Sequence, residues 1–232
     1  MKTSIFIRSY AKDFHWLAYC LRSIQKFATG FSEIVIACPE SDAPLLSHLT
    51  EERVIPVHNG PPFYLQQQVD KLKADLHTRA DYIVHVDSDM IFTRPVSPAD
   101  YMRDGNPIWV VTPFMDKEMR AWMHVMVKCF HKMPPYEFMR KCSIIAPGWI
   151  YEEFRKFIQE YHGISMEAYV MNQPGNEFSE YNCLGFFAWL NFKDKFYWHD
   201  TEKEGADWPF KQYWSYSGMT PGERQEIENY LA

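Results

Sequence analysis

The stretch Tyr82-Ile83-Val84-His85-Val86-Asp87-Ser88-Asp89 decides the fold class of this chain. Its apolar, mostly β-branched residues form a continuous run, which predicts a strand buried on both faces of a parallel sheet. In open α/β sheets of this kind, ligands bind just beyond the carboxyl ends of the strands. The run ends there in two aspartates separated by one small polar residue. The sequence therefore predicts an α/β fold with a binding site that begins at Asp87.

The two aspartates themselves indicate what binds. Carboxylates at a buried strand end repel each other and lose solvation, and a hard divalent cation held by oxygen ligands relieves both costs. A metal at a strand end in turn favours a phosphate-bearing substrate. Asp-Ser-Asp is also ordinary turn chemistry, because Asp and Ser bond their own backbone and cap helices. The position favours the metal, since no helical pattern follows and an extended apolar run resumes at Met90 until Pro95.

The first hundred residues alternate predicted strands and helices, which is typical of βαβ units and a mostly parallel sheet. We expect strands at 4–8, 33–38, 53–57 and 82–86, and helices at 13–27, 43–49 and 63–77. Asp13 is the expected N-cap of the first helix, and Gly30 its expected stop.

The second half is less regular and rich in aromatic residues. We expect strands at 107–114, 143–146 and 196–198, and helices at 117–131, 150–161, 179–190 and from Thr220 onward. Thr220 and Glu223 give the last helix a capping box, and Pro221 occupies its first position. Five aromatic residues could form a wall on which a ligand ring stacks, although core packing is the favoured interpretation for most of them: Trp198, Trp208, Tyr213, Trp214 and Tyr216. We expect one domain over 1–232, with a nucleotide-binding half at about 1–115 and a second-substrate half at about 116–232.

Composition excludes several classes of protein. A net charge of −6 gives no general nucleic-acid footprint, so any phosphate binding must be local. No apolar run approaches the ~20 residues needed to span a membrane, and no secretory h-region precedes the first strand. The cysteines are odd in number, scattered and without CxxC spacing, which fits reduced thiols: Cys20, Cys38, Cys129, Cys142 and Cys183. We expect a cytoplasmic protein with no integral membrane segment and no nucleic-acid partner.

Four stretches in order resemble the GT-A-fold glycosyltransferases that carry a DXD motif. They are Ile7–Tyr10 at a strand end, Gln67–Leu72 on a helix, His85–Asp89, and Glu177–Tyr181 followed by Gly185, which is similar to an acceptor-side motif of some bacterial and viral members. The resemblance covers roughly residues 1–200, and the order of the motifs is more specific than any one of them. It implies a GT-A, Rossmann-like sheet flanked by helices, with a less regular acceptor-side second half.

The resemblance also implies a metal site and a donor. The donor would be a nucleotide sugar, with UDP-sugar favoured, and Mn²⁺ or Mg²⁺ would stabilise the charge that develops on the leaving diphosphate. Asp89 would bind the metal directly, while Asp87 would bind the metal and the ribose. Ser88 would lie near the ribose. His199 would be a third metal ligand, although a turn pair with Asp200 is an alternative interpretation.

Further donor-binding residues follow from the same resemblance. Arg8, Ser9 and Tyr10 would line the base and ribose pocket, and Gln67 and Lys71 would face the diphosphate or the sugar. Both basic residues also have a structural interpretation. Arg8 could be a surface charge, and Lys71 could pair with Asp70 or Asp75 on a surface helix, an ion pair that stabilises the helix by only ~0.3–0.5 kcal/mol.

Glu180 is the candidate general base if the reaction inverts. The acceptor hydroxyl must lose its proton to a carboxylate within hydrogen-bond reach. Partial burial beside Phe178 and Tyr181 would raise the pKa of Glu180 toward working pH. Glu177 is the nearest competitor, and a solvated helix position is the alternative interpretation of Glu180. Inversion is expected, and a retaining mechanism stays open.

The expected function is metal-dependent transfer of a sugar from a nucleotide diphosphate donor to a hydroxyl of an acceptor glycan, with polysaccharide biosynthesis as the setting by analogy. Loops after Phe92 and near Trp208 are candidate lids. A nucleotidyltransferase is one rival, but the loop Ser9–Lys12 lacks the glycines it needs. A non-catalytic carbohydrate-binding module is another, and it would not need Asp87 or Asp89. The sugar, the acceptor, the oligomeric state and membership of a larger multidomain enzyme are left open.

Overall fold

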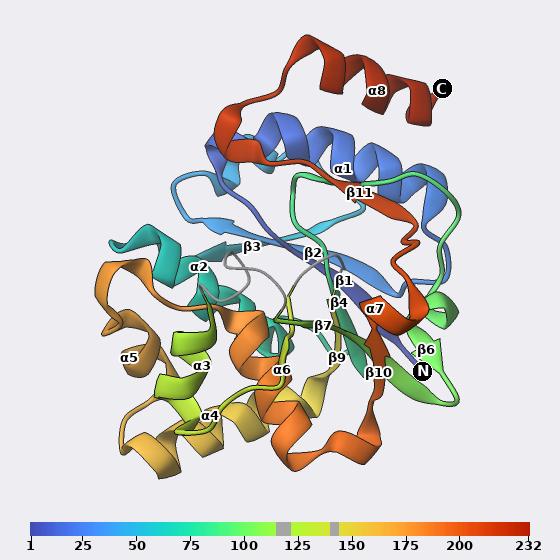
Figure 1. The fold of residues 1–232 in the computed structure, drawn as a ribbon. Helices are drawn as coiled ribbons and strands as arrows, with labels where there is room; N and C mark the ends of the chain where they lie inside the picture. Colours follow the sequence, from blue (N-terminus) through green and yellow to red (C-terminus); the bar gives the residue numbers. More distant parts are fainter. Residues whose placement is uncertain (115–121, 140–143) are drawn as a thin grey trace.

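A five-stranded sheet lies at the centre of the molecule (Figure 1). A computed structural model describes residues 1–114, 122–139 and 144–232. The strand order is β3-β2-β1-β4-β9. The bounds are β1 (Thr3–Arg8), β2 (Glu33–Pro39), β3 (Arg53–Val57), β4 (Tyr82–His85) and β9 (Ile144–Pro147). The first four strands are parallel and β9 is antiparallel to β4. The predicted mostly parallel α/β sheet is confirmed, and it is compatible with a Rossmann-like fold.

Both faces of this sheet are buried, as the continuous apolar runs predict. Ile5 and Ile7 of β1 pack into the core beneath α1, whereas Phe6, on the opposite face of the strand, packs into the second core. The first face is covered by α1 (Phe14–Phe27), with α8 (Pro221–Leu231) outside it; the second is covered by the helices of the middle of the chain (Figure 1). These are α2 (Phe63–Lys71), α3 (Met123–Phe130), α4 (Gly148–His162), α5 (Met166–Met171) and α6 (Glu180–Asn191).

Smaller elements complete the chain. One further sheet has the order β10-β7-β6 with β8 paired to β7, and β11 pairs with β5. The strands are β5 (Met90–Phe92), β6 (Met102–Arg103), β7 (Asn106–Pro113), β8 (Tyr136–Glu137), β10 (Tyr197–Asp200) and β11 (Phe210–Gln212). A short helix, α7 (Thr201–Glu204), follows β10. The 3-10 helices are η1 (Ala11–Asp13), η2 (Ala43–Leu46), η3 (Ala74–His77), η4 (Pro98–Tyr101), η6 (Pro174–Asn176), η7 (Lys193–Lys195) and η8 (Ser215–Ser217).

Some helix ends agree with the sequence-based prediction and others do not. The capping box of Thr220 and Glu223 starts α8, as predicted, and Gly163 ends α4 in the left-handed region at φ +73°. The predicted end of the first helix at Phe27 is confirmed, but the C-cap of α1 is Ala28 in an extended conformation rather than Gly30. There the chain turns into hydrogen bonds with Val96, which accepts from Thr29 N–H and donates to the Phe27 carbonyl. None of the described helices is long and apolar enough to cross a membrane.

Other predicted helices differ in length. The predicted helix at 63–77 is two pieces, α2 and η3, and the one at 43–49 is the shorter η2. The predicted helix at 117–131 is described only from its second half, as α3, because 115–121 lie outside the described residues. Cys142 and the first residue of the predicted strand at 143–146 also lie outside the described residues.

Candidate functional site

The candidate site lies where the strand order of the central sheet reverses. From β1 the chain proceeds outward through β2 and β3, then returns to place β4 on the other side of β1. A crevice forms at such a switch point, beyond the carboxyl ends of the two central strands. Arg8 ends β1, and Asp87 follows β4 two residues beyond His85. The predicted donor residues after β1 and the acidic turn after β4 therefore share one edge of the sheet.

A cavity of about 470 Å³ opens at this edge, beside the end of β1. Its lining residues are Arg8, Tyr10, Lys12, Asn59, Phe63, Tyr64 and Gln67. The structure thus brings together three of the residues predicted to bind a donor, from β1 and α2. Tyr10 and Phe63 expose much of their rings, while Ser9 is buried and its hydroxyl has no hydrogen-bond partner among the described residues.

Arg8 is buried and held by an ion pair. Its Nε lies 2.7 Å from Oδ2 of Asp70, and its guanidinium also donates to the Ser9 carbonyl and, at 3.4 Å, to Oδ1 of Asn59. Asp70 is therefore the partner of Arg8 rather than of Lys71, and Asp75 pairs with Arg155. The alternatives of a surface Arg8 and a surface Lys71 pair are both wrong.

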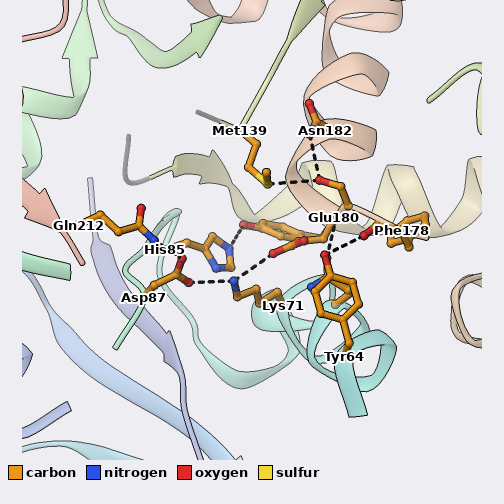
Figure 2. A network of polar contacts seen from close by, with 12 residues as sticks. Tyr64, Lys71, His85, Asp87, Met139, Phe178, Glu180, Asn182 and Gln212 are labelled. Carbon is orange, nitrogen blue, oxygen red and sulfur yellow. Dashed lines mark hydrogen bonds and ion pairs between the residues drawn. The ribbon is translucent and has the colours of Figure 1, made fainter. Parts of the chain in front are cut away.

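Lys71 lies between two carboxylates from distant parts of the chain, as Figure 2 shows. Its Nζ is 2.8 Å from Oδ1 of Asp87 and 3.0 Å from Oε1 of Glu180, and it lies over the ring of Tyr181. The Lys71 and Glu180 side chains are only 7% and 4% exposed, against 31% for Asp87. Burial lowers the pKa of Lys71, but the two carboxylates outweigh it and raise that pKa well above its usual value. The lysine is a fixed positive charge.

Glu180 is the first residue of α6, and its backbone N–H donates to Oε1 of Gln68 at 3.1 Å. Burial raises the pKa of Glu180, with Lys71 opposing that rise. The alternative of a solvated helix residue is therefore wrong for Glu180. Glu177, the competitor, is exposed and pairs with the imidazole of His124 at 3.3 Å.

The acidic turn is covered by a segment that the sequence did not predict to be there. We call Gln212–Ser215 the C-terminal strap. Gln212 donates to Oδ2 of Asp87 at 3.3 Å (Figure 2), and Ser215 N–H donates to Oδ2 of Asp89 at 3.0 Å. Tyr213 N–H donates to the Asp89 carbonyl at 2.9 Å. The strap therefore fixes both aspartates of the motif from a distance of more than a hundred residues along the chain.

Asp13 also belongs to the site. It precedes α1, yet its side chain makes no capping hydrogen bond; instead, its Oδ2 accepts from the Ser215 hydroxyl at 3.3 Å. Burial raises the pKa of Asp13, and Asp87 adds to the rise. Burial, followed by the charge of Asp87, raises the pKa of Asp89 to about 6. The carboxylates of Asp13, Asp87 and Asp89 therefore lie near one another, and among the described residues a lysine pairs only with that of Asp87.

The two motif aspartates could bind a cation whose remaining ligands come from a substrate. Among the described residues, no cationic side chain pairs with Asp89, and no three His, Cys, Asp or Glu side chains form a group that could hold a metal by themselves. Magnesium is commonly bound by one or two carboxylates, with substrate phosphates completing the site. His199 is not brought to the motif: on β10 its Nε2 lies 2.8 Å from the Gly205 carbonyl and its Nδ1 3.6 Å from Glu204.

The two loops predicted as lids are tied to each other. Thr93 N–H donates to the Pro209 carbonyl at 2.9 Å, and the guanidinium of Arg94 bonds Asp207. One loop follows β5 and the other precedes β11, and the pairing of these two strands places the C-terminal strap beside the motif. Neither a protein-family model nor a curated protein matches this chain.

Proposed function

We propose that this chain transfers a sugar from a nucleotide diphosphate donor to a hydroxyl group of an acceptor glycan, with a GT-A-type donor site. The observation that carries the proposal is the position of the cavity beside the acidic turn. Tyr10 lines the cavity, and its backbone carbonyl accepts a hydrogen bond from Asp13 N–H at 2.8 Å. The Asp13 carboxylate bonds the Ser215 hydroxyl, and Ser215 N–H bonds Asp89. A ligand in the cavity would therefore lie next to the segment that holds the motif.

The cavity suits a nucleoside. Its volume falls in the range of small-ligand pockets, which combine apolar walls with a few placed polar groups. The rings of Tyr10 and Phe63 offer flat faces for a base, and Asn59 and Gln67 offer hydrogen bonds to its edge or to the ribose. Uracil is the base that we propose, from the resemblance to DXD enzymes.

The motif suits the diphosphate. A divalent cation, Mn²⁺ or Mg²⁺, bound by Asp87 and Asp89 would neutralise the charge that develops on the leaving diphosphate. The chain holds these two carboxylates from both sides: Lys71 and Gln212 fix Asp87, and Ser215 fixes Asp89. Such preorganisation supports catalysis because the groups need not reorganise as charge develops.

Binding experiments test the donor site directly. Titration calorimetry with UDP should give binding that strengthens with Mn²⁺ and weakens when EDTA removes it. Phe63→Ala should weaken UDP binding by roughly tenfold, since stacking of a base on an aromatic ring is worth about 1–3 kcal/mol. Leu76→Ala is the matched control, because Leu76 is as exposed as Phe63 but lies on η3, outside the cavity lining. Metal-independent sugar binding without UDP affinity would instead favour a carbohydrate-binding module.

Glu180 is the base that we propose for an inverting reaction, because burial raises its pKa while the ion pair with Lys71 keeps its carboxylate oriented. Glu180→Gln should slow sugar transfer by roughly 10²-fold with little change in UDP affinity. Initial rates of transfer and UDP titrations measure the two effects separately. Glu177→Gln is the control, and it should retain the wild-type rate. Loss of activity in that variant instead would move the role of base to Glu177.

A further inference from the structure

We propose that Trp214 and Tyr216 form a platform on which a sugar ring of the acceptor glycan stacks. We call these two residues the aromatic pair. The inference rests on the proposed function, because it concerns the second substrate of the same site. It separates the aromatic pair from the other aromatic residues of the C-terminal region and gives the pair a ligand of stated chemistry.

The aromatic pair is exposed where its neighbours are not. Trp214 and Tyr216 are 61% and 86% exposed, and their ring centroids lie 6.2 Å apart. Tyr213 is buried against Trp16. Of the five aromatic residues that the sequence singled out, Trp198 and Trp208 are half-buried, so burial in the core explains no more than three.

The backbone between the two rings is fixed to the acidic turn. Ser215 separates them in sequence, and it bonds Asp89 through its N–H and Asp13 through its hydroxyl. The turn is closed by Gly218 N–H, which donates to the Ser215 carbonyl at 2.9 Å. The rings are thus carried on a turn that is bonded to the acidic motif through Ser215.

A carbohydrate matches this surface better than an apolar partner does. A pyranose presents C–H groups on its faces and hydroxyls around its edge, so it covers an aromatic ring while staying hydrated elsewhere. The two ring planes are inclined by 50°, so each ring offers its own flat face to a sugar. Polar side chains lie on the same turn or bond it: Ser217 bonds the Trp214 carbonyl, and Ser215 bonds Asp13. The donor base has its own aromatic surfaces in the cavity lining, which does not include the aromatic pair. The acceptor is therefore the substrate that the aromatic pair would hold.

The test uses the intact chain and two separate titrations. Wild type and the variants Trp214→Ala and Tyr216→Ala are titrated with UDP plus Mn²⁺, and with cellohexaose, maltohexaose and chitohexaose by saturation-transfer NMR. We expect wild type to bind at least one hexasaccharide, and each variant to weaken that binding by roughly tenfold while UDP affinity stays the same. Trp149→Ala is the control: Trp149 is also exposed, but it follows Gly148, which bonds Asp81 at the opposite end of β4.

The outcomes are distinguishable. If wild type binds none of the three hexasaccharides at millimolar concentration, or if the variants lose UDP affinity instead, the platform assignment is overturned. Equal loss of hexasaccharide binding in Trp149→Ala would overturn it too. A different measurement tests the proposed function: wild-type protein without metal-dependent affinity for UDP would contradict it. Unchanged unfolding midpoints in the variants would establish that they fold, as expected for side chains that are mostly exposed.

Discussion

Replacing Asp89 with asparagine should lower the rate of donor turnover by roughly 10³-fold or more, because a metal bound to the diphosphate supplies several kcal/mol of transition-state stabilisation. Asparagine keeps the shape of the side chain and can still accept the hydrogen bond from Ser215 N–H. It loses the negative charge that a divalent cation needs. Rates of UDP-sugar hydrolysis and of transfer, measured across a Mn²⁺ titration, give the size of the loss.

The same substitution should not destabilise the fold. The folded state raises the pKa of Asp89 to about 6 through burial and the charge of Asp87, so ionised Asp89 weakens the folded protein at neutral pH. Removing that charge should leave the unfolding midpoint unchanged or higher. Asp81→Asn is the matched control, because Asp81 precedes the same strand and its carboxylate accepts a hydrogen bond from one backbone N–H, that of Lys2, at 2.7 Å. Wild-type turnover in Asp89→Asn would remove Asp89 from the proposed metal site.

Much of the central sheet was predictable because its cues are local. Each of β1 to β4 is a short apolar run bounded by turn residues, and β3 has the predicted bounds. The edge that carries the site follows from the same runs, since the carboxyl ends of parallel strands meet on one side of a sheet. Arg8 and Tyr10 accordingly line the cavity at that edge, where Gln67 joins them from α2.

The rest of the site depends on contacts that no local pattern encodes. The C-terminal strap reaches the motif through pairing of β11 with β5. Nothing in the sequence of the strap predicts its hydrogen bond to Asp89. Asp13 looks like an ordinary N-cap, but the strap offers its carboxylate another hydrogen bond. Lys71 was predicted to face the donor, whereas in the structure it is buried between Asp87 and Glu180. In each case tertiary packing, rather than the local sequence, determines which residue the side chain or backbone group contacts.

Lys71→Met should cost about 3–5 kcal/mol of unfolding free energy, the usual cost of removing one partner from a buried ion pair. Methionine fills similar space, so the loss is electrostatic: Glu180 would be left buried without its counter-charge, and Asp87 would lose a partner at 2.8 Å. Donor turnover should fall as well, because Asp87 would no longer be held in place. Chemical denaturation at neutral pH measures the stability, and the denaturation slope m should be unchanged.

Two comparisons make the stability effect of Lys71→Met specific. Lys156 also bridges two carboxylates, Glu152 and Glu153, but on the exposed surface of α4, so Lys156→Met should hardly change the midpoint. Adding Glu180→Gln to Lys71→Met should restore about 1–3 kcal/mol, because it removes the unpaired buried charge. If the double variant is no more stable than Lys71→Met, packing rather than charge is the cause. In that case Lys71 would not be the electrostatic link that holds Asp87 and Glu180 in one site.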